Sequence, residues 1–410
     1  MDFIKNKIKA LSDSNEPDYV LFFLSSILII TGIIFSYSLS IYTVDYWEYN
    51  QFHFFLRQLL TGTLSIILMW TLSQIKPEKL IPFVGWFLFG FFLFLMVVMQ
   101  FLPASIVTES GGAKRWIRLP GISLSPVEFF KIGFIYYLAW SFHRKLLDLN
   151  KISFKEELKV LAPYGLVFGV AVFLIAFLQK DLGQVVLLAT TLFIMLIFAN
   201  RSWKLFASMI VVVISGVLAL ILLFPHRITR VQSWWSMVQD SVLSIMPEFV
   251  ATKLRIEEFP EPYQVSHSLN AIHNGGMTGV GIGNGSLKLG FLSEVHTDFV
   301  LAGISEEIGF MGFLFILVLL FGVIFRIFRT SRRVKNPKYH LFSLGIGLMI
   351  VVAFLINSYG VTGIIPIKGI AVPFLSYGGS SMLSVAIAIG LVLSISRDIP
   401  KERVKEELRE

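Results

Sequence analysis

Long apolar runs alternate with short polar connections along almost the whole chain. A helix that crosses a bilayer needs about 20 consecutive, mostly apolar residues, and the pattern predicts ten such helices. They span residues 19–41, 52–74, 79–102, 125–143, 159–178, 182–199, 203–224, 299–327, 340–365 and 374–396. A transmembrane β-barrel would instead show alternating segments of roughly ten residues, and we find none in the sequence. The predicted fold is an all-α integral membrane protein, with residues 1–410 forming a single polytopic domain.

The amino-acid composition supports a membrane protein and excludes several other classes of protein and site. The chain is 55% hydrophobic and only 15% charged, which excludes an ordinary soluble domain. It has no cysteine, so disulfides, thiol chemistry and thiolate metal sites are excluded. The formal net charge of +8 could indicate a nucleic-acid partner, but basic residues of membrane proteins gather in cytoplasmic loops. We therefore expect no nucleic acid as a partner.

The distribution of basic residues predicts the orientation. About 23 of the 35 Lys and Arg residues fall in the two termini and in every second connection. The positive-inside rule then makes both termini cytoplasmic. The connections predicted to face outward are residues 41–51, 103–124, 179–181, 225–298 and 366–373. Of these, 225–298 is a large extracytoplasmic loop, and its Trp-rich part at 232–260 could lie in the outer membrane interface or dock onto a partner.

The end of that large loop is rich in glycine and in ionisable groups. Glu294, His296 and Asp298 stand at alternate positions just before the next apolar run. Glycines let a backbone turn tightly and approach a ligand closely. A packed surface loop with solvated acids remains the alternative. Glu294 and Asp298 also offer hard oxygens for a divalent cation such as Mg²⁺ or Mn²⁺, although the sequence shows no complete metal cage and no motif for an organic cofactor.

Charged residues follow the outward connection at 103–124. Lys114 and Arg115 interrupt the positive-inside pattern, which indicates an anionic partner or a loop that tolerates cations. Glu128 and Lys131 stand three residues apart on a helix, where they can form a structural ion pair or contact substrate. Asp181, at the start of a helix, fits a cap better than a chemical role.

The last outward turn, residues 363–382, combines Pro366 and Pro373 with Lys368 and a flexible Ser-Tyr-Gly-Gly-Ser sequence. Irregular backbone at membrane depth either lines a cavity or is buried in protein. Taken with the other outward features, the turn matches a ligand that has an anionic head and a lipid tail. The candidate binding residues are Lys114, Arg115, Glu128, Lys131, Glu294, His296, Lys368, Ser376, Tyr377, Gly378, Gly379 and Ser380.

Four motifs together resemble the SEDS family, the bacterial shape, elongation, division and sporulation proteins. They are GAKRWIRLPGISLSPVEFFK, LQKDLGQ, the stretch from YQVSHSLNAIHNGG to HTDF, and GIIPIKGIAVPFLSYGGSS. The lysine of IPIKG, Lys368, is similar to the division members rather than the elongation members. Three blocks depart from the family pattern, since SPVE, QKD and IHNGG stand where the family has QPSE, QPD and IGSGG.

The resemblance implies a peptidoglycan glycosyltransferase in the bacterial inner membrane, at the division septum. Its substrates would be lipid II and the nascent glycan. Its partners would be a class B penicillin-binding protein that crosslinks the strands, other division proteins and membrane lipid.

The family's essential aspartate corresponds to Asp298, which would act as general base on the acceptor hydroxyl in an inverting transfer. Arg115, Lys114 and Lys368 would stabilise the leaving pyrophosphate. Glu294 and His296 would act directly, orient Asp298 or bind metal. A lipid II flippase, a non-catalytic division scaffold and an elongation polymerase remain alternatives.

Overall fold

The computed structural model describes residues 16–399, except 104, 111–112, 120–121, 146–153, 199–202, 257–262, 293 and 368. Each of the ten apolar segments forms a helix, which confirms the helical membrane class. These helices are α2 (Tyr19–Leu39), α4 (His53–Ser73), α5 (Pro77–Val98), α6 (Pro126–Lys145), α7 (Phe154–Val172) with its π-helical continuation η1 (Phe173–Leu178), α8 (Leu182–Phe198), α9 (Trp203–Leu222), α13 (Val300–Arg333), α14 (Pro337–Val361) and α15 (Gly379–Ser396).

Fewer than ten of these helices are long and apolar enough to cross a membrane. Seven meet both conditions among the described residues, or eight if α9 and the helix after it form one bent span. Helix α8 has only 17 residues. Helix α6 carries Glu128 and Lys131 near its start, and most of its side chains are buried in the protein. A helix that contacts protein instead of lipid needs less apolar character, because its polar groups find partners inside the bundle.

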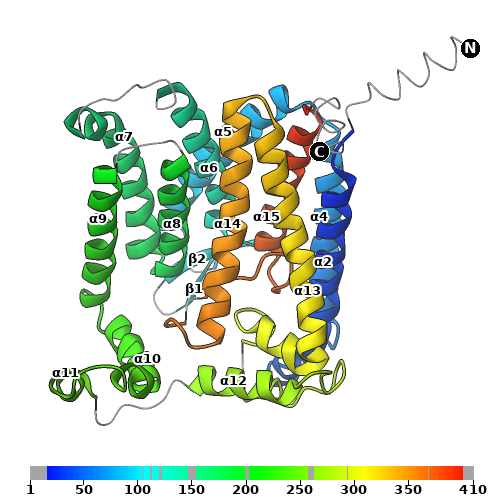
Figure 1. Ribbon diagram of the computed structural model, residues 1–410. Coiled ribbons are helices and arrows are strands. Elements are labelled where there is room, and N and C mark those ends of the chain that lie inside the picture. The colour runs from blue at the N-terminus through cyan, green and yellow to red at the C-terminus, as the bar shows by residue number, and fades with distance from the viewer. Residues whose placement is uncertain are drawn as a thin grey trace, which may run out of the picture.

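One end of the bundle gathers the start of α2 and the ends of α13 and α15. The backbone N–H of Asp18 donates to Ser396 Oγ at 2.9 Å, and Arg326 forms an ion pair with Asp18 at 2.6 Å. The other end carries residues 225–299, where α10 (Pro225–Leu243), α11 (Glu248–Leu254) and α12 (Tyr263–Gly275) lie below the bundle in Figure 1. Helix α14 runs through the middle and buries most of its residues.

Two smaller features were not predicted. A short helix, α3 (Ile41–Tyr46), follows α2. The connection at 103–124 forms an antiparallel sheet of β1 (Val107–Ser110), β2 (Ala113–Leu119) and β3 (Ile122–Leu124), in the order β1-β2-β3. Val107 and Ile117 are buried with Met99 in a small cluster under this sheet. A bulge between Thr108 and Glu109 shifts the register, and it disrupts the alternation that identifies strands from sequence.

The orientation predicted from charge can be tested because the chain has no cysteine of its own. Asn274 is exposed in α12, and Lys335 is exposed near the opposite end of the bundle. We expect an impermeant maleimide to label Asn274→Cys in sealed vesicles that expose the outer face, and to leave Lys335→Cys unlabelled. In inverted vesicles the two results should exchange. Labelling in the reverse order would contradict the predicted orientation.

Candidate active site

A cavity of ≈ 910 Å³ opens at the end of the bundle that carries residues 225–299. Its walls come from α4, β2, the turn before α8, α10, α12, the turn before α13 and the segment 366–381. The four motifs that the sequence singled out therefore meet at one place. Of the candidate binding residues, the cavity is lined by Arg115, Glu128, Glu294, Tyr377, Gly378, Gly379 and Ser380.

Asp298 lines this cavity and lies two residues before Val300, the first residue of α13. Its backbone carbonyl accepts a hydrogen bond of 2.7 Å from Asn357 Nδ2, and the same amide donates to Ile370 O at 2.8 Å. Gly369 faces the carboxylate, because a Cβ at that position would lie 2.9 Å from Asp298 Oδ2. The backbone of Asp298 is thus fixed by a buried amide, and a glycine leaves space around its carboxylate.

The surroundings of Asp298 raise its pKa to about 7. Burial is the largest cause, since a carboxylate that loses water is destabilised relative to the neutral acid. The nearby carboxylates of Glu294 and Asp181 raise the pKa further, whereas the guanidinium groups of Arg115 and Arg230 lower it. A pKa near the working pH is the property expected of a group that exchanges a proton during a reaction.

Glu294 and His296 differ in position although they share a motif with Asp298. Glu294 is exposed, lines the cavity and accepts a 2.8 Å hydrogen bond from Thr297 Oγ1. His296 is 6% exposed and does not line the cavity. It packs between the rings of Phe54 and Tyr377, at 5.0 and 5.7 Å, and burial lowers its pKa. His296 therefore contributes packing behind the site, and Glu294 contributes charge within it.

The predicted cations also differ in their position relative to the cavity. Arg115 lines the cavity and is oriented by the carbonyls of Gln179 and Lys180, at 2.8 and 3.0 Å. Lys114 instead donates to the carbonyls of Gln100 and Leu102, at 3.0 and 2.7 Å, beyond the C-terminus of α5, and it does not line the cavity. Lys368 lies outside the described residues.

Two cavity arginines were missed by the sequence analysis. Arg57 lies within α4, and a single arginine in an otherwise apolar segment was a usable signal for function. Arg57 also forms a side-chain hydrogen bond with Tyr377. Arg230 belongs to α10, where the surrounding mixture of charges and aromatics gave no pattern that distinguishes it.

The inner wall carries the predicted ion pair. Lys131 Nζ lies 2.9 Å from Glu128 Oε2, and Gln184 Nε2 donates to Glu128 Oε1 at 2.9 Å. The predicted pairing is confirmed, while Glu128 also lines the cavity. Asp181 Oδ1 accepts from the Gln184 N–H at 3.2 Å, so it caps α8 as expected. It lines the cavity as well, where burial raises its pKa.

The serines of the last turn hold the site together. Ser376 Oγ donates to the carbonyl of Thr297 at 2.7 Å and accepts from Val372 N–H at 2.8 Å. Ser380 Oγ donates to Ser123 O at 2.8 Å and accepts from Ser125 N–H at 2.9 Å. These contacts join the segment 372–380 to the turn that carries Asp298 and to β3. Ser376 does not line the cavity, so it supports the site from behind.

The cavity carboxylates could form only part of a metal site. Within the described residues, no group of three or more His, Asp or Glu side chains could hold a metal ion. Glu294 and Asp298 line one cavity, yet they supply only two carboxylates. Mg²⁺ is usually held by one or two carboxylates together with waters and substrate phosphates, so Glu294 and Asp298 would be the residues to hold such an ion.

Comparison with known proteins identifies relatives along nearly the full length. A profile of the FTSW_RODA_SPOVE family, described as "Cell cycle protein", matches residues 18–400. The probable peptidoglycan glycosyltransferase FtsW of Helicobacter pylori strain J99 is 49% identical over 385 residues, which cover 93% of this chain and 98% of the relative. Stage V sporulation protein E of Bacillus subtilis strain 168 is 31% identical over 387 residues, which cover 93% and 97%.

Solved structures share the fold. The crystal structure of the Thermus thermophilus rod shape determining protein RodA has a TM-score of 0.62 at 21% identity, covering 93% of this chain and 97% of that one. A chain from a study of "Structural coordination of polymerization and crosslinking by a peptidoglycan synthase complex" has a TM-score of 0.67 at 22% identity, covering 93% and 98%. At such identities the likeness supports the fold alone.

Proposed function

Because the chain belongs to the FtsW/RodA/SpoVE family, we propose that it is a peptidoglycan glycosyltransferase of the division type, which polymerises lipid II into septal glycan. The observation that carries this proposal is Asp298, a cavity carboxylate with a pKa of about 7 beside two arginines. The relatives named FtsW support the division role, and they match along 93% of the chain, so we propose that the activity belongs to one polytopic domain.

The proposed reaction is a single displacement at the anomeric carbon of the donor. The acceptor is the GlcNAc 4-hydroxyl of lipid II, which is a poor nucleophile. Asp298 in its ionised form takes the hydroxyl proton while the oxygen attacks C1 of the growing glycan, and the bond from C1 to the undecaprenyl pyrophosphate oxygen breaks. The α-linked donor thus gives a β-linked product. Base catalysis by a positioned carboxylate typically contributes about 10²–10⁴-fold.

The leaving pyrophosphate needs positive charge in a site that excludes water. Arg115 and Arg230 both line the cavity and both lie close enough to Asp298 to lower its pKa. Because its Nε and one Nη are already bound to carbonyls, Arg115 is held in one orientation before substrate arrives. We assign leaving-group stabilisation to these arginines.

The same proposal includes partners and location. One solved structure of this fold belongs to a peptidoglycan synthase complex that coordinates polymerization and crosslinking. A class B penicillin-binding protein would thus crosslink the strands that this chain makes, in the inner membrane at the division septum. Trp234, in the Trp-rich segment predicted to meet a partner or the membrane, donates to the carbonyl of Gly363 at 2.8 Å and so also docks onto its own chain.

Reconstitution separates polymerisation from the alternative flippase activity. The purified chain, alone and with its transpeptidase, should convert fluorescent lipid II in detergent into glycan chains visible on a gel. In detergent there is no bilayer across which lipid II could be moved, so a flippase would form no glycan there. Lipid II translocation in vesicles without any glycan product in either assay would contradict the polymerase proposal.

A further inference from the structure

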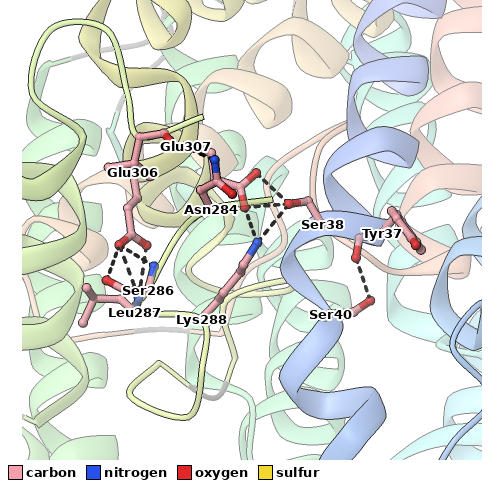
Figure 2. Close-up of polar contacts among 10 residues, drawn as sticks. Tyr37, Ser38, Ser40, Asn284, Ser286, Leu287, Lys288, Glu306 and Glu307 are labelled. Carbon is pink, nitrogen blue, oxygen red and sulfur yellow. Dashed lines mark hydrogen bonds and ion pairs between the residues drawn. The ribbon is translucent and has the colours of Figure 1, made fainter. Parts of the chain in front are cut away.

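A buried polar cluster joins α2, α13 and the loop that leads to Asp298 (Figure 2). Lys288 Nζ lies 2.6 Å from Glu307 Oε1, and the two side chains are 1% and 0% exposed. Ser38 Oγ lies 2.6 and 2.7 Å from the two oxygens of Glu307 and accepts from Lys288 Nζ at 3.2 Å. Lys288, which belongs to the large loop before α13, is therefore buried inside the protein.

These charges lie away from the cavity. Neither Lys288 nor Glu307 lines the cavity. Removing two charges from water costs free energy that their mutual attraction offsets only with good geometry and further hydrogen bonds. Ser38 supplies such a bond, so the cluster is a complete three-part anchor between distant segments.

The neighbouring carboxylate fixes the backbone on the N-terminal side of Lys288. Glu306 Oε1 accepts from the N–H of Ser286 at 2.9 Å, from its hydroxyl at 3.1 Å and from the N–H of Leu287 at 3.2 Å. Glu306 is 2% exposed. Two successive glutamates of α13 thus hold three successive residues of the loop (Figure 2).

A break in α13 extends this attachment. Gly309 has a φ of 65°, which interrupts the helix after its first turns. The carbonyls of Glu306 and Glu307 accept instead from the N–H groups of Val280 and Gly281, at 3.0 and 2.9 Å. The N–H of Phe310 donates to the Gly276 carbonyl at 2.9 Å. The break therefore supplies the backbone groups that bind the loop.

The other end of the loop is fixed at the site itself. Asn357 binds the carbonyl of Asp298, and Ser376 binds that of Thr297. Lys288 precedes Asp298 by ten residues and Glu307 follows it by nine, so the ion pair closes a short ring of chain around the carboxylate. We therefore expect loss of the ion pair to shift Asp298 relative to Gly369 and Arg115.

We propose that Lys288 and Glu307 are positioning residues, which set the place of the Asp298 carboxylate from outside the cavity through the chain between them. The proposal rests on the proposed glycosyltransferase function. A displacement of about 1 Å at a reacting group can cost on the order of 10²-fold in rate. Loss of the pair should therefore lower kcat and leave substrate binding nearly unchanged.

The test uses Glu307→Gln in the full chain with its transpeptidase, selected as monodisperse protein. We expect kcat to fall about 10²-fold while KM for lipid II changes less than about twofold. The double variant Lys288→Met/Glu307→Gln leaves no unpaired buried charge. Its kcat should therefore be at least about tenfold higher than that of Glu307→Gln alone. Wild-type kcat in Glu307→Gln would overturn the proposal.

A matched control lies at the opposite end of the same two elements. Arg326 of α13 pairs with Asp18 before α2 at 2.6 Å, far from the cavity. Arg326→Gln should lower thermal stability and leave kcat unchanged. An equal loss of kcat in both variants would show a general structural effect and overturn the positioning role. If Glu307→Gln does not fold, Ser38→Ala removes only the hydroxyl and should lower kcat several-fold, and unchanged kcat would again overturn it.

Hydrogen exchange separates this inference from the proposed function. Amides of residues 288–299 should lose protection in Glu307→Gln and keep it in Arg326→Gln, whether or not the protein polymerises glycan. Unchanged protection of this segment in Glu307→Gln would reject the anchor. An inactive wild type with the expected exchange pattern would reject the glycosyltransferase and leave the anchor in place.

Discussion

Replacing Asp298 by asparagine should reduce glycan polymerisation to a small residual rate while the protein still folds and still binds its transpeptidase. The amide keeps the shape and the hydrogen bond of the Asp298 backbone to Asn357, but it cannot accept the hydroxyl proton. Loss of a general base typically costs about 10²–10⁴-fold. Product formation by Asp298→Asn from fluorescent lipid II is the measurement, with size-exclusion profile and transpeptidase binding measured on the same sample.

Asp45→Asn provides the control for this experiment. Asp45 is an exposed carboxylate of α3 that does not line the cavity. It should polymerise lipid II at the parent rate. If Asp298→Asn also made glycan at near the parent rate, Asp298 would not be the base, and the flippase and scaffold alternatives would regain support.

Replacing Arg115 by glutamine should reduce polymerisation about 10²–10³-fold, the typical loss when one charge-stabilising donor is removed from an active site. The guanidinium also fixes the carbonyls of Gln179 and Lys180 next to Asp181, so part of the effect comes through that turn. Arg115→Lys keeps the charge without the planar fork and should be intermediate. Single-turnover rates with preformed donor are the appropriate measurement.

Arg118→Gln is the matched control because Arg118 belongs to the same strand but does not line the cavity. It should retain the parent rate. An Arg115→Gln protein that folds and reacts at the parent rate would restrict Arg115 to holding the 179–181 turn. Arg230 would then be the remaining cavity cation near Asp298.

The long apolar runs predicted the ten helical segments, because a single segment in a membrane satisfies its own backbone hydrogen bonds only as a helix. The motifs also indicated Asp298, Arg115 and Glu128, since polar residues beside apolar segments need a reason to be there. The sequence did not separate Arg115 from Lys114, although they are adjacent. Both belong to β2, where successive side chains point to opposite faces, and Arg115 lines the cavity while Lys114 binds carbonyls beyond the end of α5.

Long-range pairing explains the other misses. No sequence pattern paired Lys288 with Glu307, yet each is buried against the other and against Ser38, which is 250 residues away from Lys288 in sequence. Ser376 and Ser380 were predicted to bind substrate, and their hydroxyls donate to the backbone carbonyls of Thr297 and Ser123, although Ser380 also lines the cavity. A local sequence pattern can indicate that a polar residue needs a partner, whereas the tertiary fold determines which residue that partner is.

The pH dependence of polymerisation tests the central claim, that Asp298 takes the acceptor proton, most directly. Only the ionised carboxylate is a base, so activity should be present above the folded-state pKa of about 7 and lost as pH falls through it. The account predicts that log kcat/KM rises by about one unit per pH unit below that value and is level above it, and that Asp298→Asn removes this dependence. A wild-type rate that is constant between about pH 5 and 9, or an unchanged profile in Asp298→Asn, would contradict it.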